Sequence, residues 1–560
     1  MSQIGRPPCD EAAILHGPTG TPCTAGAQRW TLVAAVLGSS MAFVDGTVAN
    51  VALPALQRSL NATAFEAQWV IESYALFLAS LLLAGGAFGD RFGRRRVFMI
   101  GVGLFSAASV ACGVSVTVHQ LIVARSVQGI GAALLIPGSL SLISAAFPQA
   151  QRGRAIGTWS AFSGITAAVG PVIGGYLVDH YSWAWAFLIN APIGVILLIV
   201  CTVKVPESRR EASRDALDLW GALWATLGLA GAVFALIEAP SRGWGSITVL
   251  SAVLIGAVGL TLFGRVESAV RSPMLPLVLF RVRNFAGANV LTLLLYAALG
   301  GGLYFLPLNL IQVQGFSSTA AGASLLPFIA IMFALSSWAG QLVDRFGPRI
   351  PLVVGPVVAA VGFALFAVPG LDSNYWSAFF PAICVLGVGM SITVAPLTTT
   401  VMNSVGAELA GVASGVNNAV SRTAALLAIA VFGLVMSSAF NASLNASLPH
   451  AQAAPEVLAA IDAQRHKLAG IALPEGLDAP VATLLTAAVR ESFVAGFRWV
   501  MLLSAALALL SALSAWLIMD DGPGTQGSSA DKANERDRPT PPVPAGGAEA
   551  RLTPVPDLPP

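Results

Sequence analysis

The sequence predicts an all-α membrane protein with fourteen transmembrane helices, arranged as two six-helix bundles plus a two-helix insertion. Composition is the first observation, because 56% of the 560 residues are hydrophobic and only 10% are charged, whereas soluble domains carry about 25% charged residues. A repeated loop is the second. The segment GGAFGDRFGRRR at 85–96 returns as AGQLVDRFGPR at 339–349, and such a repeat indicates two copies of the bundle around it.

Fourteen apolar runs are long enough to span a membrane, since a core about 30 Å thick needs roughly 20 residues. They begin near Trp30, Gln68, Val97, Gln120, Ile156, Ala184, Leu217, Ile247, Ala286, Ala320, Ile350, Trp376, Gly411 and Phe493. The repeat divides them into six, two and six. We therefore expect a cytoplasmic tail at 1–29, a six-helix bundle at 30–205 and a linker with two extra spans at 206–284. A second six-helix bundle follows at 285–519 and includes an outer loop at 437–492. The chain then continues as a disordered cytoplasmic tail at 520–560.

The distribution of Lys and Arg predicts the orientation in the membrane. The connections on one side hold most of the basic residues, including the run from Arg94 to Arg96, and cytoplasmic connections are the ones enriched in Lys and Arg. Both termini are then cytoplasmic and the loop at 437–492 lies outside. The basic residues are mostly Arg and alanine is abundant, which indicates a GC-rich bacterial genome. Together with the fourteen spans, this leads us to expect a multi-pass protein of a bacterial inner membrane.

Several function classes find no support in the sequence. The net charge of only +2 and the scattered basic residues do not favour a nucleic-acid partner. The five cysteines show no CxxC spacing, so we expect neither a metal site nor a disulfide framework. No G-x-x-x-x-G-K-[ST] nucleotide motif is present. A membrane enzyme would need a His/Asp or Ser/His constellation, and the outer-loop histidines have no evident partner motif. We expect no catalytic residues and no cofactor.

Four segments together carry a family signature: G-x-x-x-D-R-x-G-R-R-R from Gly86, DGTVANVALP at 45–54, LIVARSVQGIGAA at 121–133 and the glycine-rich stretch at 157–175. As a set they resemble the major facilitator superfamily, in its 14-span drug:H+ antiporter branch. Two looser matches are WAWAFLINAPIG at 183–194 and GVASGVNNAVSR at 411–422. The chain departs from the family pattern at Thr166, where Gly is usual, and at Ala184, where Arg is usual.

The resemblance implies the major facilitator fold and a proton-coupled secondary exporter of amphipathic toxic compounds, a multidrug efflux protein working by alternating access. The implied partners are a small-molecule substrate, protons and the lipid bilayer. An accessory periplasmic protein is left open. The alternative is a transporter of the same fold with a narrow physiological substrate, either a metabolite exporter or an uptake symporter.

Ionisable residues inside the predicted spans are few, and burying a charge there is costly, so they are candidates for proton coupling. Asp45 lies near the middle of the first span, with Glu72 in the second and Arg125 in the fourth. An apolar cavity favours the neutral acid and a nearby guanidinium favours the carboxylate, so a changing Asp45–Arg125 distance would load and release a proton. The alternatives are a static ion pair, and for Glu72 a side chain that reaches water. We interpret Arg422 as a packing or interfacial residue.

The two copies of the loop predict a conformational latch, because a carboxylate there can pair with guanidiniums and with a helix N-terminus. The latch residues are Gly86, Asp90, Arg91, Gly93 and Arg94 in the first copy and Asp344 and Arg345 in the second. The first copy has more arginines, so we expect it to be the stronger latch. The alternative is that both loops only fix topology.

A proline between glycines in the fifth span matches the antiporter motif, at Gly170, Pro171, Gly174 and Gly175. Proline removes a backbone donor and small residues allow helices to approach closely. The functional interpretation is a bend that seals the cavity and favours exchange, and the alternative is ordinary packing.

Polar side chains within the spans are candidates for the substrate cavity. They are Asn50, Tyr74, Gln128, Asn190, Asn309 and Asn417. Packing or interfacial roles are equally open for most of them.

Overall fold

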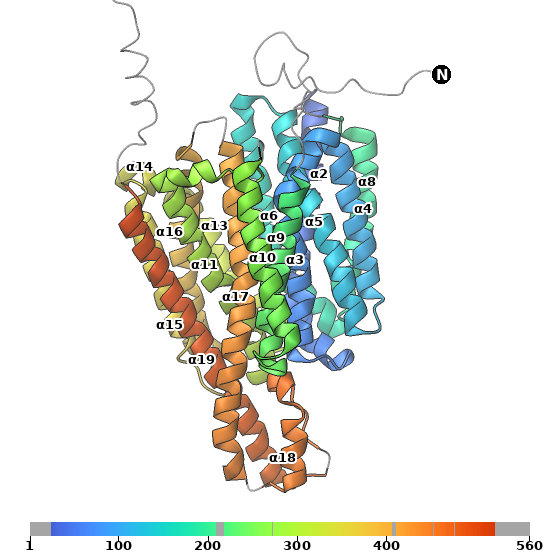
Figure 1. Ribbon diagram of the computed structural model, residues 1–560, viewed down its shortest axis with the longest axis vertical. Coiled ribbons are helices and arrows are strands. Elements are labelled where there is room, and N and C mark those ends of the chain that lie inside the picture. Colours follow the sequence, from blue (N-terminus) through green and yellow to red (C-terminus); the bar gives the residue numbers. More distant parts are fainter. Residues whose placement is uncertain are drawn as a thin grey trace, which may run out of the picture. The chain divides into compact units, whose positions relative to one another are not determined.

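The computed structural model describes residues 24–208, 218–270, 273–405, 410–451, 453–474 and 476–520. In these ranges every regular element is a helix, and 14 helices are long and apolar enough to cross a membrane (Figure 1). The predicted all-α class and number of spans are therefore confirmed. The predicted tail at 520–560, apart from Asp520, and most of the tail at 1–29 lie outside the described residues.

The first six spans form the N-terminal bundle. Helix α3 starts with a capping box, in which Thr63 and Glu66 each accept the other's backbone N–H. It ends at Gly93, whose φ of 105° suits glycine, and α4 begins at the next residue. The bounds are α2 Ala25–Ser59, α3 Ala64–Phe92, α4 Arg94–Gly113, α5 Val118–Ala146, α6 Gln149–His180, and α7 Trp185–Leu188 followed by α8 Asn190–Lys204.

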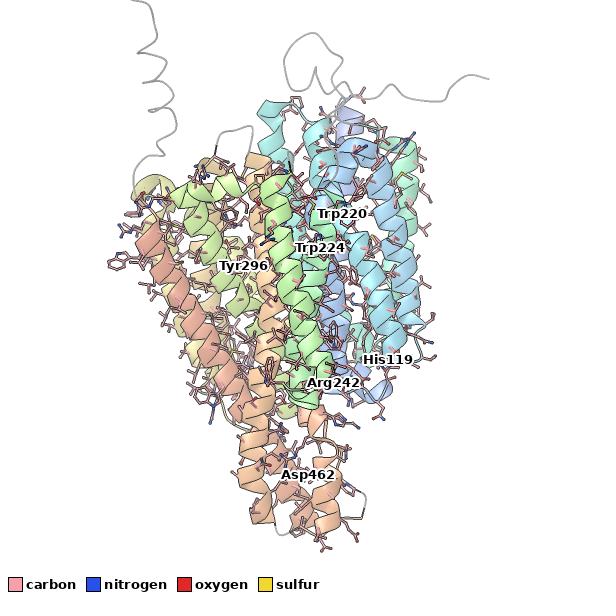
Figure 2. The ribbon with its side chains drawn as sticks, viewed as in Figure 1. His119, Trp220, Trp224, Arg242, Tyr296 and Asp462 are labelled. Carbon is pink, nitrogen blue, oxygen red and sulfur yellow. The ribbon has the colours of Figure 1, made fainter. Side chains whose placement is uncertain are left out.

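The insertion consists of α9 Leu219–Arg242 and α10 Ile247–Ala269. Helix α9 packs on both bundles, since its Leu229, Val233 and Ile237 share one apolar cluster with Leu76 of α3 and Leu426 of the C-terminal bundle. Helix α10 packs mainly on α9. Figure 1 shows the pair beside α3 and α17, with Trp220 and Arg242 at opposite ends of α9 in Figure 2. The insertion therefore covers a seam between the two bundles.

The last six spans form the C-terminal bundle, in which π-helical turns extend two of the helices. The bounds are α11 Arg283–Leu308 with η2 Asn309–Val313, α12 Ser318–Ala323 and α13 Leu326–Gly340, α14 Leu342–Phe346 and α15 Arg349–Phe366, η3 Tyr375–Phe379 with α16 Phe380–Asn403, α17 Ala410–Ser447 and α19 Ala479–Ile518. A short 3-10 turn, η1 Leu277–Arg281, precedes this bundle. The six, two and six arrangement confirms the predicted fold class.

Helices α17 and α19 are unusually long, with 38 and 40 residues. At about 1.5 Å per residue, each is nearly twice the length of a bilayer core about 30 Å thick. Between them lie η4 Leu448–Ala451, α18 Pro455–Asp462 and η5 Arg465–Gly470. The predicted loop at 437–492 is therefore largely helical, because its alanine-rich ends continue the spans although they are too polar to count as apolar runs.

The two ends of the helices need separate names. An even number of spans precedes each copy of the repeated loop, so both copies lie at one end, which we call the motif end. The opposite end, which holds α18, is the α18 end (Figure 1). Polar contacts between the bundles gather toward the α18 end: Gln57 with Gln312, Gln68 with the Ile429 carbonyl, Asn61 with Lys467, and Asp179 with Ser318 and Thr319. In this conformation the bundles are thus fastened at the α18 end.

Candidate functional site

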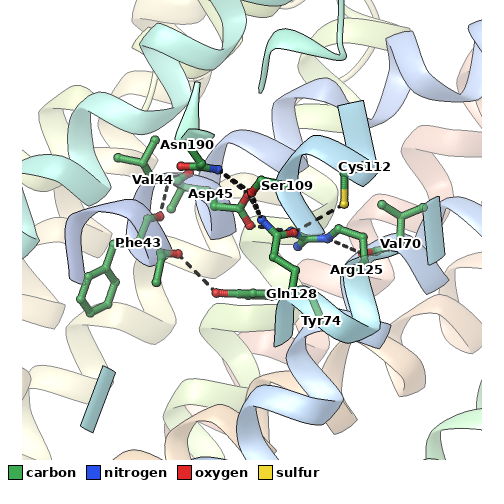
Figure 3. Close-up of polar contacts among 12 residues, drawn as sticks. Phe43, Val44, Asp45, Val70, Tyr74, Ser109, Cys112, Arg125, Gln128 and Asn190 are labelled. Atoms are coloured by element: carbon green, nitrogen blue, oxygen red, sulfur yellow. Dashed lines mark hydrogen bonds and ion pairs between the residues drawn. The ribbon is translucent and has the colours of Figure 1, made fainter. Parts of the chain in front are cut away.

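A buried ion pair occupies the middle of the N-terminal bundle. Asp45 of α2 and Arg125 of α5 are 1% and 0% exposed, and Arg125 Nη1 lies 2.5 Å from Asp45 Oδ2 (Figure 3). The structure thus brings together the two residues that the sequence singled out for proton coupling. A buried pair of this kind persists only where further hydrogen bonds satisfy both groups.

Three of the predicted cavity residues supply those further contacts. Gln128 donates from Nε2 to Asp45 Oδ1 at 2.7 Å and accepts from Arg125 at 2.6 Å. Asn190 Nδ2 also donates to Asp45 Oδ1, at 3.0 Å. The Tyr74 ring lies 4.2 Å from the Arg125 guanidinium carbon (Figure 3). Gln128, Asn190 and Tyr74 therefore surround the ion pair.

Three further contacts of this network were not found from the sequence. Ser109 Oγ accepts from Gln128 at 2.6 Å and from Asn190 at 3.2 Å. Arg125 Nε donates to the Val70 carbonyl at 3.0 Å, and the Phe187 ring lies 5.5 Å from the guanidinium. Serine and phenylalanine are common in membrane helices, so no signal in the sequence separated these two from packing residues.

Glu72 of α3 is fully buried, at 0% exposure. Neither of its carboxyl oxygens has a hydrogen-bond partner among the described residues. Gln68, one turn earlier on α3, donates to the Ile429 carbonyl of α17. Glu72 therefore lies near the boundary of the two bundles and does not reach water in this conformation.

The first copy of the repeated loop is held by a residue that the sequence analysis missed. Glu207, which follows α8, accepts the backbone N–H groups of Arg95 and Arg96 at the start of α4, at 3.0 and 3.2 Å. A Cβ at Gly93 would meet this carboxylate at 3.0 Å, so glycine fits both the turn and the contact. In the sequence Glu207 stands in a charged segment that resembles a solvated loop.

The other latch residues of the first copy contact the loop itself or a neighbouring helix of the N-terminal bundle. Asp90 pairs with Arg94, four residues on, at 2.8 Å. Arg91 is exposed and lies over the Phe92 ring. Gly86 would place a Cβ 3.6 Å from Pro137 of α5. These contacts connect parts of the same bundle.

The second copy is described only in part. The Asp344 side chain lies outside the described residues, and Arg345 is exposed. Arg349 donates to the Trp516 carbonyl of α19 at 2.6 Å. The difference in strength between the two latches stays a prediction.

The antiporter motif lies where α6 is packed between the two bundles. A Cβ at Gly170 or Gly174 would collide with Thr47 or Val48 of α2, while one at Gly175 would collide with the backbone of Ser318, the first residue of α12. Helix α6 continues through Pro171, whose carbonyl faces Gly322 of α12. The glycines therefore allow α6 to contact α2 and the opposite bundle together.

One turn beyond the motif, Asp179 fastens α6 to the C-terminal bundle. Its carboxylate accepts from the Ser318 and Thr319 N–H groups at 3.1 and 2.8 Å and from the Thr319 hydroxyl at 2.6 Å. The sequence analysis did not single it out, because an aspartate at a helix end is usually a solvated side chain. Among the described residues, Asp179 makes more hydrogen bonds between the two bundles than any other side chain.

The remaining cavity candidates do not meet at one place. Asn50 of α2 has an unpartnered buried Oδ1, and Asn309 is buried at the start of η2. Asn417 of α17 donates to Thr292 Oγ1 at 2.7 Å. Separately, a mainly apolar cavity of about 470 Å³ lies between α2, α6 and α8, and Asn190 is among its lining residues.

Known proteins are similar to this chain in sequence and in architecture. The family model described as Major Facilitator Superfamily matches residues 35–430. The chain is 34% identical to the multidrug resistance protein Stp of Mycobacterium tuberculosis, over 87% of this chain and 91% of the relative. It is 33% identical to the tetracenomycin C resistance and export protein of Streptomyces glaucescens, over 86% of this chain and 90% of the relative.

Solved structures agree with the fold. A bacterial homolog of the human lysosomal transporter Spinster, in an inward-facing and occupied conformation, superimposes with a TM-score of 0.58 at 17% identity, covering 93% of this chain and 100% of that chain. A D-xylose-proton symporter gives 0.56 at 14% identity, covering 89% and 99%. At these identities the likeness concerns the fold alone.

Proposed function

This chain belongs to the major facilitator superfamily of membrane transporters, as its motifs predicted, and we propose that it is a proton-coupled exporter of amphipathic toxic compounds working by alternating access. The relatives named for drug resistance and antibiotic export support outward transport of such compounds. The observation on which proton coupling rests is the buried Asp45–Arg125 pair with its hydrogen-bonded surroundings.

In this proposal Asp45 is the proton carrier. The charged form accepts from Arg125, Gln128 and Asn190. Protonation removes the ion pair and leaves Arg125 with Gln128, the Val70 carbonyl and two aromatic faces. Loading a proton therefore loosens the link between α2 and α5.

A continuous path of contacts leads from Asp45 to the boundary of the bundles. Val48, three residues after Asp45 on α2, packs on Gly174 of α6. On the adjoining face of α6, Gly175 meets the backbone at Ser318 in the opposite bundle. A shift of α2 on protonation would thus be felt where α6 meets α12, which supports coupling of the proton to alternating access.

A single proton supplies enough energy for useful export. One charge crossing the membrane gains about 2.3 kcal/mol per 100 mV, so entry into a cell held near 150 mV gives roughly 3.5 kcal/mol. That corresponds to about a 300-fold gradient of a neutral compound.

The test of the proposed function is transport of a panel of amphipathic compounds into inverted vesicles, with and without a proton gradient. Uptake of no compound, or uptake unaffected by a protonophore, would contradict the proposal.

The orientation proposed from the basic residues places the motif end in the cytoplasm, in a bacterial inner membrane. A cysteine-free variant with single cysteines at Arg96 or Ala463, both exposed, tests it. An impermeant maleimide on intact cells should label only the Ala463 site, because α18 then lies outside. Labelling at Arg96 alone would reverse the proposed direction of export.

Glu72 is proposed as a second proton site, because a buried carboxyl without partners is accommodated more cheaply as the neutral acid. We expect Glu72→Gln to reduce the accumulation ratio at a fixed proton gradient by up to about 300-fold at 150 mV, since each driving proton multiplies that ratio by this factor. Glu66→Gln on the same helix is the matched control, because Glu66 caps the helix start. An unchanged ratio in Glu72→Gln would assign this residue a structural role.

A further inference from the structure

Arg422 lies on the face of α17 that is turned toward the N-terminal bundle. Ala419, three residues earlier, packs on the cluster that contains Tyr74 of α3, and Leu426, four residues later, packs with Leu76 of α3. Residues three and four apart share one face of a helix. The guanidinium is therefore directed to the region between α17 and α3, inside the span Val412–Ser447.

In the described part of the chain Arg422 has no carboxylate partner. Among the described residues its one hydrogen bond runs from Nε to Asn418 Oδ1, at 3.2 Å. Arg125, in contrast, is matched by Asp45. Arg422 is half-buried and lies in a transmembrane helix. Charges in such positions mark substrate or ion pathways, because the membrane interior penalises them.

The groups next to Arg422 offer hydrogen-bond donors. The planar guanidinium keeps its two terminal nitrogens, whose N–H groups match the two oxygens of a carboxylate. Asn418 Oδ1 accepts from Arg422, and the Nδ2 donors of the same amide make no hydrogen bond among the described residues. Across the boundary, Tyr74, Leu78 and Leu82 of α3 belong to the buried apolar cluster on which Ala419 packs. A ligand that complements these groups has an anionic oxygen beside an apolar body.

We propose that Arg422 and Asn418 form an anion-recognition site, and that the compounds handled by this protein are amphipathic acids bearing a carboxylate or phenolate group. This inference rests on the proposed export function and names its substrate class. The guanidinium pairs with the anionic oxygen at the boundary of the bundles, and the apolar part of the compound lies against α3. A bound acid would supply the negative charge that the described residues do not place beside Arg422.

The test measures binding to the full-length protein in lipid nanodiscs, which needs no proton gradient. The probes are matched pairs of aromatic acids and their neutral amides, beginning with 2-naphthoate and 2-naphthamide and continuing to larger ring systems. We expect at least one acid to bind about tenfold or more tightly than its amide, as charge-assisted hydrogen bonds imply. Arg422→Gln should abolish this preference, and Arg422→Lys should retain part of it.

The control variant is Arg242→Gln, since Arg242 is an exposed arginine of α9 paired with Glu238. It should keep the preference for acids, which separates a general loss of positive charge from the loss of this site. Size-exclusion profiles of both variants must match the unmodified protein, and Arg422→Lys replaces Arg422→Gln if the latter does not assemble. If no acid binds more tightly than its amide, or if Arg422→Gln keeps the preference, the proposal is wrong.

Vesicle transport distinguishes this proposal from the broader one. If a proton gradient drives neutral and acidic compounds equally, export stands and the anion site is refuted. If acids bind through Arg422 but no compound follows the proton gradient, the site stands and proton-coupled export fails.

Discussion

Asp45→Asn is expected to abolish proton-driven transport while the protein still assembles in the membrane. The amide preserves the size of the side chain and resembles the protonated acid, but it cannot release a proton. Accumulation in inverted vesicles with a proton gradient should fall to the level without the gradient, a loss of up to about 300-fold at 150 mV. Exchange of labelled for unlabelled compound, which needs no net proton movement, should persist.

A static ion pair would behave differently, and a double variant separates the two interpretations. Removing one partner of a buried pair costs about 3–5 kcal/mol, because the remaining charge is uncompensated, whereas removing both is far less costly. If the Asp45–Arg125 pair only ties α2 to α5, Asp45→Asn with Arg125→Gln should restore both thermal stability and proton-driven transport. If Asp45 carries the proton, the double variant recovers stability alone. Recovery of driven transport would remove Asp45 from the mechanism.

The ion pair could be predicted from the sequence because charged residues within apolar spans are rare and need partners. Asp45 and Arg125 were the clearest such residues in the first bundle, and the structure places them in contact. Their neighbours were harder to assign. Gln128 and Asn190 were recognised as polar residues of the spans but were interpreted as lining a cavity, because hydrogen-bond direction depends on how four separate helices pack.

Two acidic residues escaped the sequence analysis for a related reason. Glu207 and Asp179 both stand at the ends of spans, where carboxylates are usually solvated. Only the folded chain shows that Glu207 accepts from the first turn of α4 and that Asp179 accepts from the residues that begin α12. The helical stalk formed by α17 and α19 was also missed, because counting apolar runs detects membrane crossing and not helix length.

The position of Asp179 predicts that it stabilises the conformation with the α18 end closed. Its three charge-assisted hydrogen bonds connect α6 to the start of α12 across the two bundles. Because the side chain is exposed, we expect Asp179→Asn to cost about 1 kcal/mol, which changes the ratio of the two conformations roughly fivefold. Spin labels at Tyr181 and Val368 lie at the α18 end, one on each bundle. In Asp179→Asn a larger fraction of molecules should show the longer distance between the two labels.

Asp372→Asn is the matched control for this variant. Asp372 is also an exposed carboxylate at the α18 end, but its partner Arg490 belongs to the same bundle. This variant loses the same charge without losing a contact between the bundles, so its distance distribution should match that of the unmodified protein. Equal shifts in both variants would show that surface charge, and not the contact of Asp179, sets the conformational equilibrium.

Asp90→Asn should move the same equilibrium in the opposite direction if the first copy of the repeated loop is a latch. In this conformation Asp90 pairs with Arg94 inside its own loop. As a latch, Asp90 would therefore stabilise the other conformation, in which the motif end is closed. Labels at Phe92 and Phe346, at the motif end of each bundle, should then report a wider separation in Asp90→Asn, and a smaller change in Asp344→Asn. Opposite shifts of the conformational equilibrium in Asp179→Asn and Asp90→Asn would mean that each end of the transporter has its own stabilising contact. An unchanged distribution in both loop variants would mean that the loops only fix topology, leaving Asp179 and its neighbours on α6 to control opening.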